Sequence, residues 1–271
     1  MPELPEVETV RTGLEPLLSG REISAISCHR TGLRYPFPDF STLTGQRITT
    51  VSRRSKYLLF ELDGTQTLVW HLGMTGQFHL LSAEDEKAKH EHVRIDLLGG
   101  ESLRYRDARR FGYAGLLDSL TLLSHPWFAS LGPEPLSPSF TTEHLLAICH
   151  GRKAPIKTVI MDASVVVGVG NIYAAESLFR AGIHPARAAG NISKKRLARL
   201  TFTIKQVLTE AIAAGGSTIS DFVKADGKPG YFTHSFQVYG RENSACFHCG
   251  KAIKRITQSG RSSFYCPGCQ R

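Results

Sequence analysis

The first residues of the chain carry groups that could form a covalent bond to a substrate. Removal of the initiator methionine would leave Pro2 as a free secondary amine with a pKa of about 8, partly neutral at pH 7. Such an amine can attack an electrophilic carbon and form an iminium ion. Glu3 and Glu6 stand beside it and could donate a proton or stabilise the cation. This start predicts Schiff-base chemistry; the simpler alternative is that the two glutamates only favour the beginning of a helix.

Four of the six cysteines form two closely spaced pairs towards the C-terminus. They follow the pattern Cys246-x2-Cys249-x16-Cys266-x2-Cys269. Two CxxC pairs at this separation supply four thiolates that can converge on one Zn²⁺ ion, and they leave no coordination position open for catalysis. The pattern therefore predicts a structural zinc site; two disulfides are the alternative, which a reducing cytoplasm disfavours. We expect the remaining Cys28 and Cys149 to be small buried apolar residues.

Two glycine-bounded segments present side chains suited to insertion into a stack of bases. In residues 71–76 two glycines flank Met74, and residues 107–112 present Arg109 and Phe111 after a predicted strand. An unbranched apolar chain, a guanidinium group and an aromatic ring on loop tips can fill the gap left by an extruded base. On these segments alone, packing of Met74 and Phe111 in the core is the simpler interpretation.

The positive charge of the chain is concentrated in its second half. The formal net charge is +9; residues 1–150 hold 15 Lys and Arg against 18 Asp and Glu, whereas residues 151–271 hold 18 against 6. A one-sided positive field attracts phosphate polyanions. We therefore favour a nucleic-acid ligand over the alternative of a merely soluble basic protein.

The composition excludes several classes of protein. With 271 residues, 41% of them hydrophobic and 21% charged, the chain is expected to fold into one large domain or two ordinary ones. No apolar stretch approaches the roughly 18 uncharged residues of a membrane helix. The first ten residues contain three glutamates and no basic residue, which excludes a signal or transit peptide and favours a cytoplasmic protein.

The hydrophobic pattern changes from helical to strand-like and back again. Residues 6–19 repeat apolar side chains at helical spacing and end at Gly20. Eight short β-prone runs then predict an antiparallel sandwich or barrel: 23–27, 47–51, 57–62, 67–71, 77–81, 93–98, 102–106 and 112–117. After a Pro-rich linker at 131–139, we expect helices at 142–150, 156–161, 172–181 and 193–214, a Gly-rich crossing at 165–171, and hairpin strands at 252–257 and 262–265. The predicted fold class is α+β.

Several motifs together resemble one family, the bacterial formamidopyrimidine-DNA glycosylases, which remove 8-oxoguanine and ring-opened purines. The motifs are PELPEVET at 2–9, KYLL at 56–59, HLGM at 71–74, RRFG at 109–112, VGVGNIY at 167–173 and DGKPGYF at 226–232, followed by the four-cysteine hairpin. One alternative is the endonuclease VIII type, which opens PEGPE where this chain has PELPE. Another is a non-catalytic zinc-bearing binder of damaged DNA, for which nothing would require the Pro2-Glu3 start.

This resemblance implies a fold and a division into domains. We expect an N-terminal antiparallel β-sandwich with a leading helix, and a C-terminal helical domain with a helix–two-turn–helix element and a four-cysteine zinc hairpin. The expected boundaries are 1–131 for the catalytic sandwich, 132–139 for a linker, 140–240 for the DNA-binding helical domain and 241–271 for the zinc finger hairpin.

The resemblance also assigns catalytic roles. Pro2 would be the Schiff-base nucleophile, Glu3 the acid that assists opening of the deoxyribose ring, and Glu6 a further catalytic residue. Lys56 would act at the phosphate and in β-elimination; its simpler interpretation is a solvated basic run. Arg261 would grip the phosphates around the lesion and serve δ-elimination.

Further contacts to DNA follow from the same resemblance. They are expected from His90, Arg109, Arg152, Lys157, Asn171, Lys228 and Tyr231, with Met74, Arg109 and Phe111 filling the void. Residues 217–232 would cover the flipped base. Asn171 could instead cap a helix. Two positions depart from the family. Ala108 replaces a proline, and Ser220 stands where some relatives carry a basic residue. The second departure means that the contacts between residues 217–232 and the flipped base are not assigned.

The activity implied is that of a bifunctional DNA glycosylase and lyase. It would excise an oxidised purine through a Schiff base on Pro2 and cleave the strand by β,δ-elimination, leaving a one-nucleotide gap with phosphates at both ends. We expect one structural Zn²⁺ and no redox or nucleotide cofactor, because the imine serves as the electron sink. The expected partner is double-stranded DNA with an oxidised base, bound by a monomer in the bacterial cytoplasm, with the nucleoid.

Overall fold

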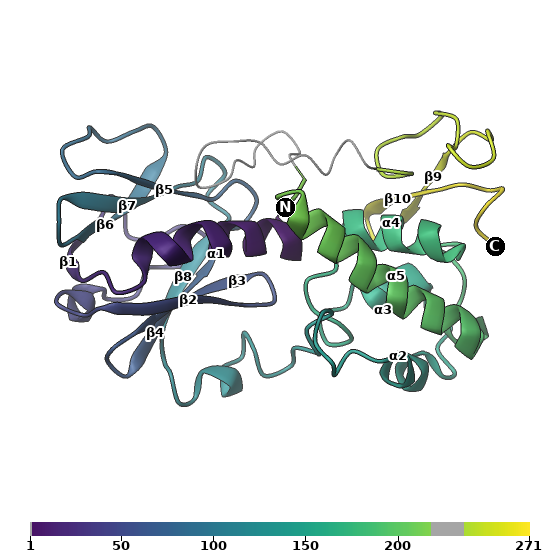
Figure 1. Ribbon diagram of the computed structural model, residues 1–271, viewed down its shortest axis with the longest axis horizontal. Helices are drawn as coiled ribbons and strands as arrows, with labels where there is room; N and C mark the ends of the chain where they lie inside the picture. The colour runs from purple at the N-terminus through teal and green to yellow at the C-terminus, as the bar shows by residue number, and fades with distance from the viewer. Residues whose placement is uncertain (1, 218–235) are drawn as a thin grey trace. The chain divides into compact units, whose positions relative to one another are not determined.

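The computed structural model describes residues 2–217 and 236–271. These residues form two compact units, one holding residues 2–129 and 215–217 and the other residues 130–214 and 236–271 (Figure 1). None of the helices in the described ranges combines the length and the apolar character that a membrane crossing requires.

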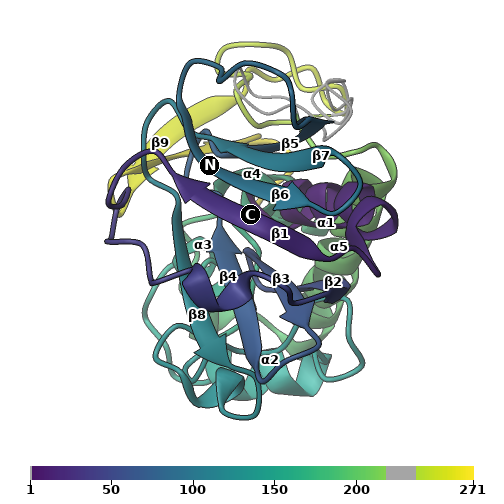
Figure 2. The ribbon, with the colours of Figure 1, turned by 90° about the vertical axis from the view of Figure 1, so that its left-hand side faces the viewer.

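The first unit is an antiparallel β-sandwich that follows helix α1 (Leu4–Leu18). One sheet has the strand order β1-β6-β7-β5 and the other β2-β3-β4-β8 (Figure 2). The strands are β1 (Ile23–Cys28), β2 (Ile48–Arg54), β3 (Tyr57–Leu62), β4 (Gln66–His71), β5 (Gln77–Ser82), β6 (Glu91–Leu97), β7 (Glu101–Arg106) and β8 (Tyr113–Asp118). All eight expected strands are present, and the predicted sandwich with a leading helix is confirmed.

The core of this unit lies between the two sheets and under α1. Trp70 of one sheet packs against Phe78 and Tyr105 of the other, with ring centroids 5.1 and 4.7 Å apart. Helix α1 adds a stripe of buried residues at helical spacing: Val7, Val10, Leu14 and Leu18. Each such side chain stabilises the fold by about 1.5–3 kcal/mol through burial. This core holds the strand ends, and therefore the loops that follow them, in fixed positions.

The two cysteines outside the paired motif differ in burial. Cys149 is buried at the end of helix α2 (Thr142–Cys149), as expected. Cys28 is exposed, so the prediction of a buried residue is wrong there. It is the last residue of β1, an edge strand whose one partner among the described strands is β6, at the point where the sheet gives way to a surface loop.

The strand pairing gathers several loops at one end of the sandwich. Because neighbouring strands are antiparallel, β1, β2, β4 and β7 end there, whereas β3, β5, β6 and β8 begin there. The segments 29–37, 55–56, 72–76 and 107–112 all leave the sandwich at this end. Helix α1 runs against the direction of β2, since Glu8 bonds to Arg53 and Glu15 to Thr50. The N-terminus of α1 therefore lies at the same end, which we call the loop end.

The second unit is helical and ends in a two-stranded hairpin. Its elements are α2, α3 (Ile156–Ile160), α4 (Asn171–Ala181), α5 (Lys194–Ala213), β9 (Lys254–Gln258) and β10 (Arg261–Tyr265). Apolar side chains of the four helices share one buried cluster. The valines of the Gly-rich crossing, Val165, Val166 and Val167, are completely buried between α3 and α4. Gly182 ends α4 with a φ of 69°, a left-handed conformation that favours glycine. The expected helices and hairpin are present.

Candidate functional site

The first turn of α1 fixes two buried carboxylates directly after Pro2, which is itself buried. The Glu3 side chain accepts a hydrogen bond from the backbone N–H of Glu6, and Glu6 Oε2 accepts one from the N–H of Glu3 at 2.9 Å, a reciprocal capping box. Glu6 Oε1 accepts from both the N–H and the hydroxyl of Ser217, each at 2.7 Å. These bonds hold Glu3 beside Pro2 and make Glu6 a positioning residue; its direct part in a reaction stays a prediction.

Lys56 is carried by the two-residue turn between β2 and β3. The guanidinium of Arg53 pairs with Glu8 of α1 at 2.7 Å and also donates to the carbonyl of Ser55 at 2.7 Å. This arrangement ties the turn to the helix that begins just after Pro2. The structure therefore places Pro2 and Lys56 together at the loop end of the sandwich.

The two glycine-bounded turns are locked to each other. A Cβ atom on Gly73 would lie 2.3 Å from the backbone nitrogen of Gly112, so only glycine permits this approach. The buried carboxylate of Asp107 accepts from the N–H of Gly112 at 2.8 Å, from the N–H of Arg109 at 3.2 Å and from the hydroxyl of Thr75. One carboxylate thus joins both turns. This role of Asp107 was not predicted from the sequence, although an Asp that opens a turn often bonds to the backbone two residues on.

The three predicted wedge residues lie together at a cavity. Phe111 is 45% exposed, and the guanidinium carbon of Arg109 lies 5.0 Å from the centroid of its ring. Met74 is half-buried. All three line a cavity of about 630 Å³ at the loop end. Phe111 is therefore a surface residue rather than a core residue, while its insertion into DNA stays a prediction.

His71 supports the first of the two turns as a neutral base. Its Nδ1 accepts a hydrogen bond from the N–H of Gly73 at 3.0 Å, and its ring stacks on Tyr113 with centroids 4.9 Å apart. Burial, followed by the nearby cations Lys56 and Arg34, lowers the pKa of His71 to about 4. The imidazole is therefore uncharged at neutral pH and keeps its acceptor. Nothing in the sequence pattern indicates this role, because it depends on contacts made in the fold.

We expect His71 to make the stability of the protein fall in mild acid. In the unfolded chain His71 becomes protonated below about pH 6.5, whereas in the folded protein it stays neutral down to about pH 4. The free energy of unfolding therefore decreases as the pH falls through this window. The expected difference between pH 7 and pH 4 is about 3 kcal/mol. Urea unfolding of the wild type and His71→Asn at both values measures it. Asparagine keeps an acceptor for Gly73 without titrating, so an equal acid loss in both proteins contradicts the assignment.

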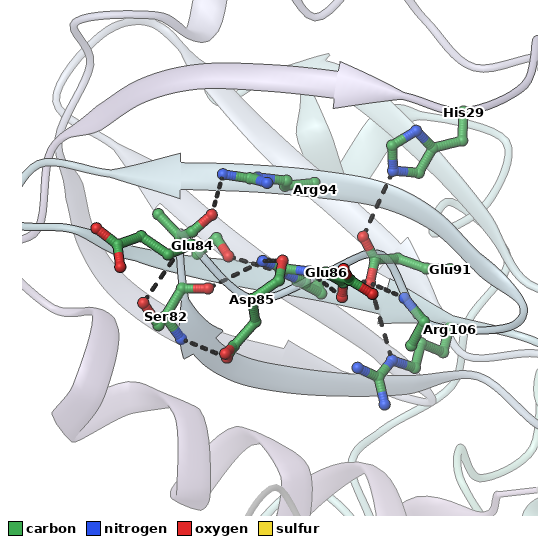
Figure 3. Close-up of polar contacts among 12 residues, drawn as sticks. His29, Ser82, Glu84, Asp85, Glu86, Glu91, Arg94 and Arg106 are labelled. Carbon is green, nitrogen blue, oxygen red and sulfur yellow. Dashed lines mark hydrogen bonds and ion pairs between the residues drawn. The ribbon is translucent and has the colours of Figure 1, made fainter.

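A buried ion-pair network holds the chain segment that leads to His90 (Figure 3). Residues 83–90 cross the outer face of one sheet, from the end of β5 to the start of β6. The fully buried guanidinium of Arg104 donates to the carbonyl of Ser82, the last residue of β5, and to the carbonyls of Asp85 and Glu86 in this crossing. Its Nη1 lies 3.5 Å from the buried carboxylate of Glu91. The network fixes the chain on both sides of the exposed His90, which lies at the loop end with a φ of 63°.

In the second unit a buried lysine joins three elements. Lys157 Nζ donates to Asn171 Oδ1 at 2.6 Å, to Ser263 Oγ at 2.7 Å and to the carbonyl of Ser262 at 3.0 Å. Three protein acceptors match the three N–H groups of an ammonium. Direct contact of Lys157 with a phosphate therefore stays a prediction, and its observed role is to position Asn171 and the start of β10.

Arg261 begins β10 beside this lysine. It is exposed and, with Lys157, lines a cavity of about 340 Å³. Asn171 is the first residue of α4, at the positive end of the helix dipole. A helix N-terminus and a guanidinium group both favour an anion. The structure thus brings Lys157, Asn171 and Arg261 together in a setting that suits a phosphate.

The four paired cysteines converge on one point. Their Sγ atoms all lie within 4.8 Å of one another, and none of the four is in a disulfide. Tetrahedral zinc with Zn–S bonds of about 2.3 Å requires sulfur atoms about 3.8 Å apart. The Sγ atoms of Cys246 and Cys269 are 3.9 Å apart, and those of Cys249 and Cys266 are 3.3 Å apart. The thiol set therefore fits a zinc ion, and it is the one such ligand cluster within the described ranges.

Three further DNA contacts were predicted, and the structure describes one of them, Arg152. Arg152 is exposed in the loop after α2, where its backbone bonds to Cys149 and Gly190. Its contact with DNA stays a prediction. Lys228, Tyr231 and all of the expected cover beyond Ser217 lie outside the described residues.

Three family models match successive parts of the chain. They are the formamidopyrimidine-DNA glycosylase N-terminal domain at residues 1–114, the formamidopyrimidine-DNA glycosylase H2TH domain at 131–223, and the zinc finger found in FPG and IleRS at 244–271. Together with the sandwich and the four-cysteine site, they define the class as an H2TH-type DNA glycosylase with a zinc finger.

Full-length relatives make the assignment specific. A formamidopyrimidine-DNA glycosylase of Phenylobacterium zucineum is 49% identical over 287 residues, with both chains covered in full. A Lactococcus lactis FPG mutant in complex with a Fapy-dG containing DNA matches with a TM-score of 0.92 and 33% identity over the whole of both chains. The Lactococcus lactis Fpg with an abasic site containing DNA matches equally well over 99% of both. The chain belongs to the formamidopyrimidine-DNA glycosylase family.

Proposed function

We propose that this protein excises oxidised purines from duplex DNA and then cleaves the strand at the vacated site. Family membership supports both the glycosylase and the lyase activity. At the level of residues, the observation that carries the proposal is the placement of Pro2, Glu3 and Lys56 at the loop end. The two locked turns with Met74 and Phe111 leave the sandwich at that same end.

The first step uses the N-terminal amine. The lone pair of the Pro2 nitrogen attacks C1′, the bond from C1′ to the damaged base breaks, and the base leaves with the proton that the Pro2 nitrogen loses. Glu3 then protonates the ring oxygen of the sugar, which opens the ring and gives an iminium ion between C1′ and Pro2. The capping box supports this role because it holds the Glu3 carboxyl group one residue from the reacting nitrogen.

The next steps break the two phosphate esters. The iminium acidifies the proton on C2′; its loss expels the 3′ phosphate, and a second elimination expels the 5′ phosphate. Hydrolysis of the iminium returns the free amine of Pro2. Lys56 would act on the phosphate in the first elimination, and Arg261 would neutralise phosphate charge in the second. No redox or nucleotide cofactor is needed, because the iminium accepts the electrons.

The zinc ion would have a supporting role. Cys246, Cys249, Cys266 and Cys269 would hold it, and it would supply the free energy that folds the hairpin. Four thiolates leave it no open position. Its function would be to fix Arg261, which lies in the strand between the two pairs.

We extend the proposal to the partner and the setting. The substrate is double-stranded DNA with an oxidised base, and one chain suffices because it supplies the amine, the acid and the phosphate-binding groups. We place the protein with the genomic DNA of a bacterial cell, in the cytoplasm.

Two duplexes that differ only in the lesion test the function. One carries a single 8-oxoguanine and the other a single thymine glycol. We expect faster base release and strand cleavage on 8-oxoguanine. A preference for thymine glycol would indicate the endonuclease VIII type, and tight binding without release of either base would indicate a non-catalytic binder.

Phe111→Ala is expected to slow excision from duplex DNA by about 10- to 100-fold, because filling the vacated stack offsets an extrusion cost of a few kcal/mol. Cleavage of a preformed abasic site should change much less, since no base has to be extruded. Single-turnover rates on the two substrates measure the difference. Phe202→Ala, which removes another exposed ring on α5, is the control. Equal losses on both substrates would show that Phe111 does not act as a wedge.

A further inference from the structure

Four arginines surround the cavity beside the wedge, and the mechanism uses only one of them. Arg30 and Arg34 belong to segment 29–37, which follows β1, whereas Arg109 and Arg110 belong to the turn before β8. All four are exposed. Leu33 adds an apolar surface between the two walls. The cavity, about 630 Å³, therefore combines a cationic rim with the wedge residues.

None of these four guanidinium groups forms an ion pair within the part of the chain that the structure describes. Among the described residues, no carboxylate lies within 4.0 Å of any of them. Arginines elsewhere in the same unit behave differently: Arg21 pairs with Glu101 at 2.8 Å, and Arg47 with Glu22 at 3.2 Å, at the opposite end of the sandwich. Like charges held close together without partners repel one another, so the cluster is poised for an anionic ligand.

Segment 29–37 is held in place by bonds to the neighbouring elements. The N–H of His29 donates to the carbonyl of His92 at 2.9 Å, and the N–H of Arg34 donates to the carbonyl of Gly112 at 3.3 Å. His29 Nε2 lies 3.4 Å from a carboxylate oxygen of Glu91, the buried centre of the network in Figure 3. The segment is thereby fixed at its start and fastened to the wedge turn. The two arginines are presented by a preorganised loop.

We propose that Arg30 and Arg34 bind backbone phosphates of the DNA duplex next to the extruded base. The inference rests on the proposed function, and it adds a phosphate-binding site on the sandwich to the one around Arg261. Guanidinium groups match phosphate oxygens in charge and geometry. Lys87 and Lys89, both exposed, approach the same end on the neighbouring crossing segment and extend the positive surface. A DNA strand that passes the wedge residues would contact both the arginines of segment 29–37 and the lysines of the crossing segment.

Salt dependence of binding tests the site. Each arginine that neutralises a phosphate should contribute about one unit to the slope of log affinity against log salt. For the double variant Arg30→Ala/Arg34→Ala we expect the slope to fall by about two and the affinity near 0.15 M salt to fall by about 10- to 100-fold. The charge-keeping double variant Arg30→Lys/Arg34→Lys should retain most of the slope. Arg21→Ala/Arg47→Ala removes equal charge at the opposite end and is the matched control.

Uncharged linkages in the DNA backbone identify the strand that carries the contacted phosphate. Single methylphosphonate linkages are placed around the lesion in either strand, and fluorescence anisotropy measures affinity for wild type and Arg34→Ala. At the phosphate that Arg34 contacts, the neutral linkage should lower the affinity of the wild type but should not lower the affinity of the variant any further. The proposal is supported whichever strand carries this phosphate. The proposal would be overturned if the neutral linkage lowered the affinity of Arg34→Ala as much as that of the wild type at every position. It would also be overturned if the salt slope of Arg30→Ala/Arg34→Ala equalled that of the control variant.

The same preparations separate this inference from the proposed function. If the wild type excises 8-oxoguanine while the arginine variants keep its affinity and slope, only the phosphate site is wrong. If the variants lose slope as expected but the wild type releases no base, the phosphate site stands and the proposed activity fails.

Discussion

A chain that keeps a residue ahead of Pro2 is expected to lose both excision and strand cleavage by at least about 10⁴-fold. The nitrogen of Pro2 is then a tertiary amide without a basic lone pair, so it cannot add to C1′. The effect is large because every bond-breaking step follows from that first addition. Single-turnover rates on 8-oxoguanine and abasic duplexes measure it.

The matched control is the same preparation after its N-terminal extension has been removed. Both forms contain every residue from Pro2 onward, including Glu3, Glu6 and Ser217, whose hydrogen bonds hold the start of α1. Activity should appear with the exposed amine, whereas binding to undamaged DNA should differ little. An extended chain that cleaves abasic DNA at the rate of the processed chain would show that another group is the nucleophile.

Cys249→Ala is expected to release the metal and weaken DNA binding by about 100-fold or more, because zinc binding supplies the folding free energy of the hairpin that carries Arg261. Both tryptophans, Trp70 and Trp127, lie in the first unit. Their fluorescence should therefore still report a folded sandwich. Bound zinc, DNA affinity and tryptophan emission are measured on one preparation.

Cys28→Ala controls for loss of a thiol, since Cys28 is exposed and lies outside the four-cysteine cluster. It should keep both the zinc and the DNA affinity. A Cys249→Ala protein that is free of zinc and still binds DNA like the wild type would show that the hairpin does not position Arg261 for the phosphate.

Features that depend on short stretches of sequence were predictable. Strands such as β3 and β7 follow from β-prone runs bounded by turn residues, and the zinc ligands follow from two CxxC pairs at a suitable separation. Pro2 and Glu3 are recognisable because only an N-terminal amine gives proline a nucleophilic role. The family motifs supplied the expected roles of Lys56 and Arg261, which residue type and spacing alone leave open.

Features that depend on distant contacts were not predictable. Arg104 reads as an ordinary strand residue, yet it collects carbonyls of a crossing segment about twenty residues earlier. Asp107 and His71 acquire their roles only when the fold presses the Gly73 turn against Gly112. The exposure of Cys28 depends on β1 being an edge strand, which the order of strands in the sheet decides.

Trapping of the reaction intermediate tests the central claim most directly. Borohydride present during turnover of an 8-oxoguanine duplex should reduce the iminium to a stable amine and leave a covalent protein–DNA adduct. Peptide mapping should place that adduct on the N-terminal residue, Pro2, and Pro2→Gly, which keeps a primary amine, should retain part of the trapping. An adduct mapped to Lys56 in the processed wild-type protein would contradict the account and make Pro2 a bystander.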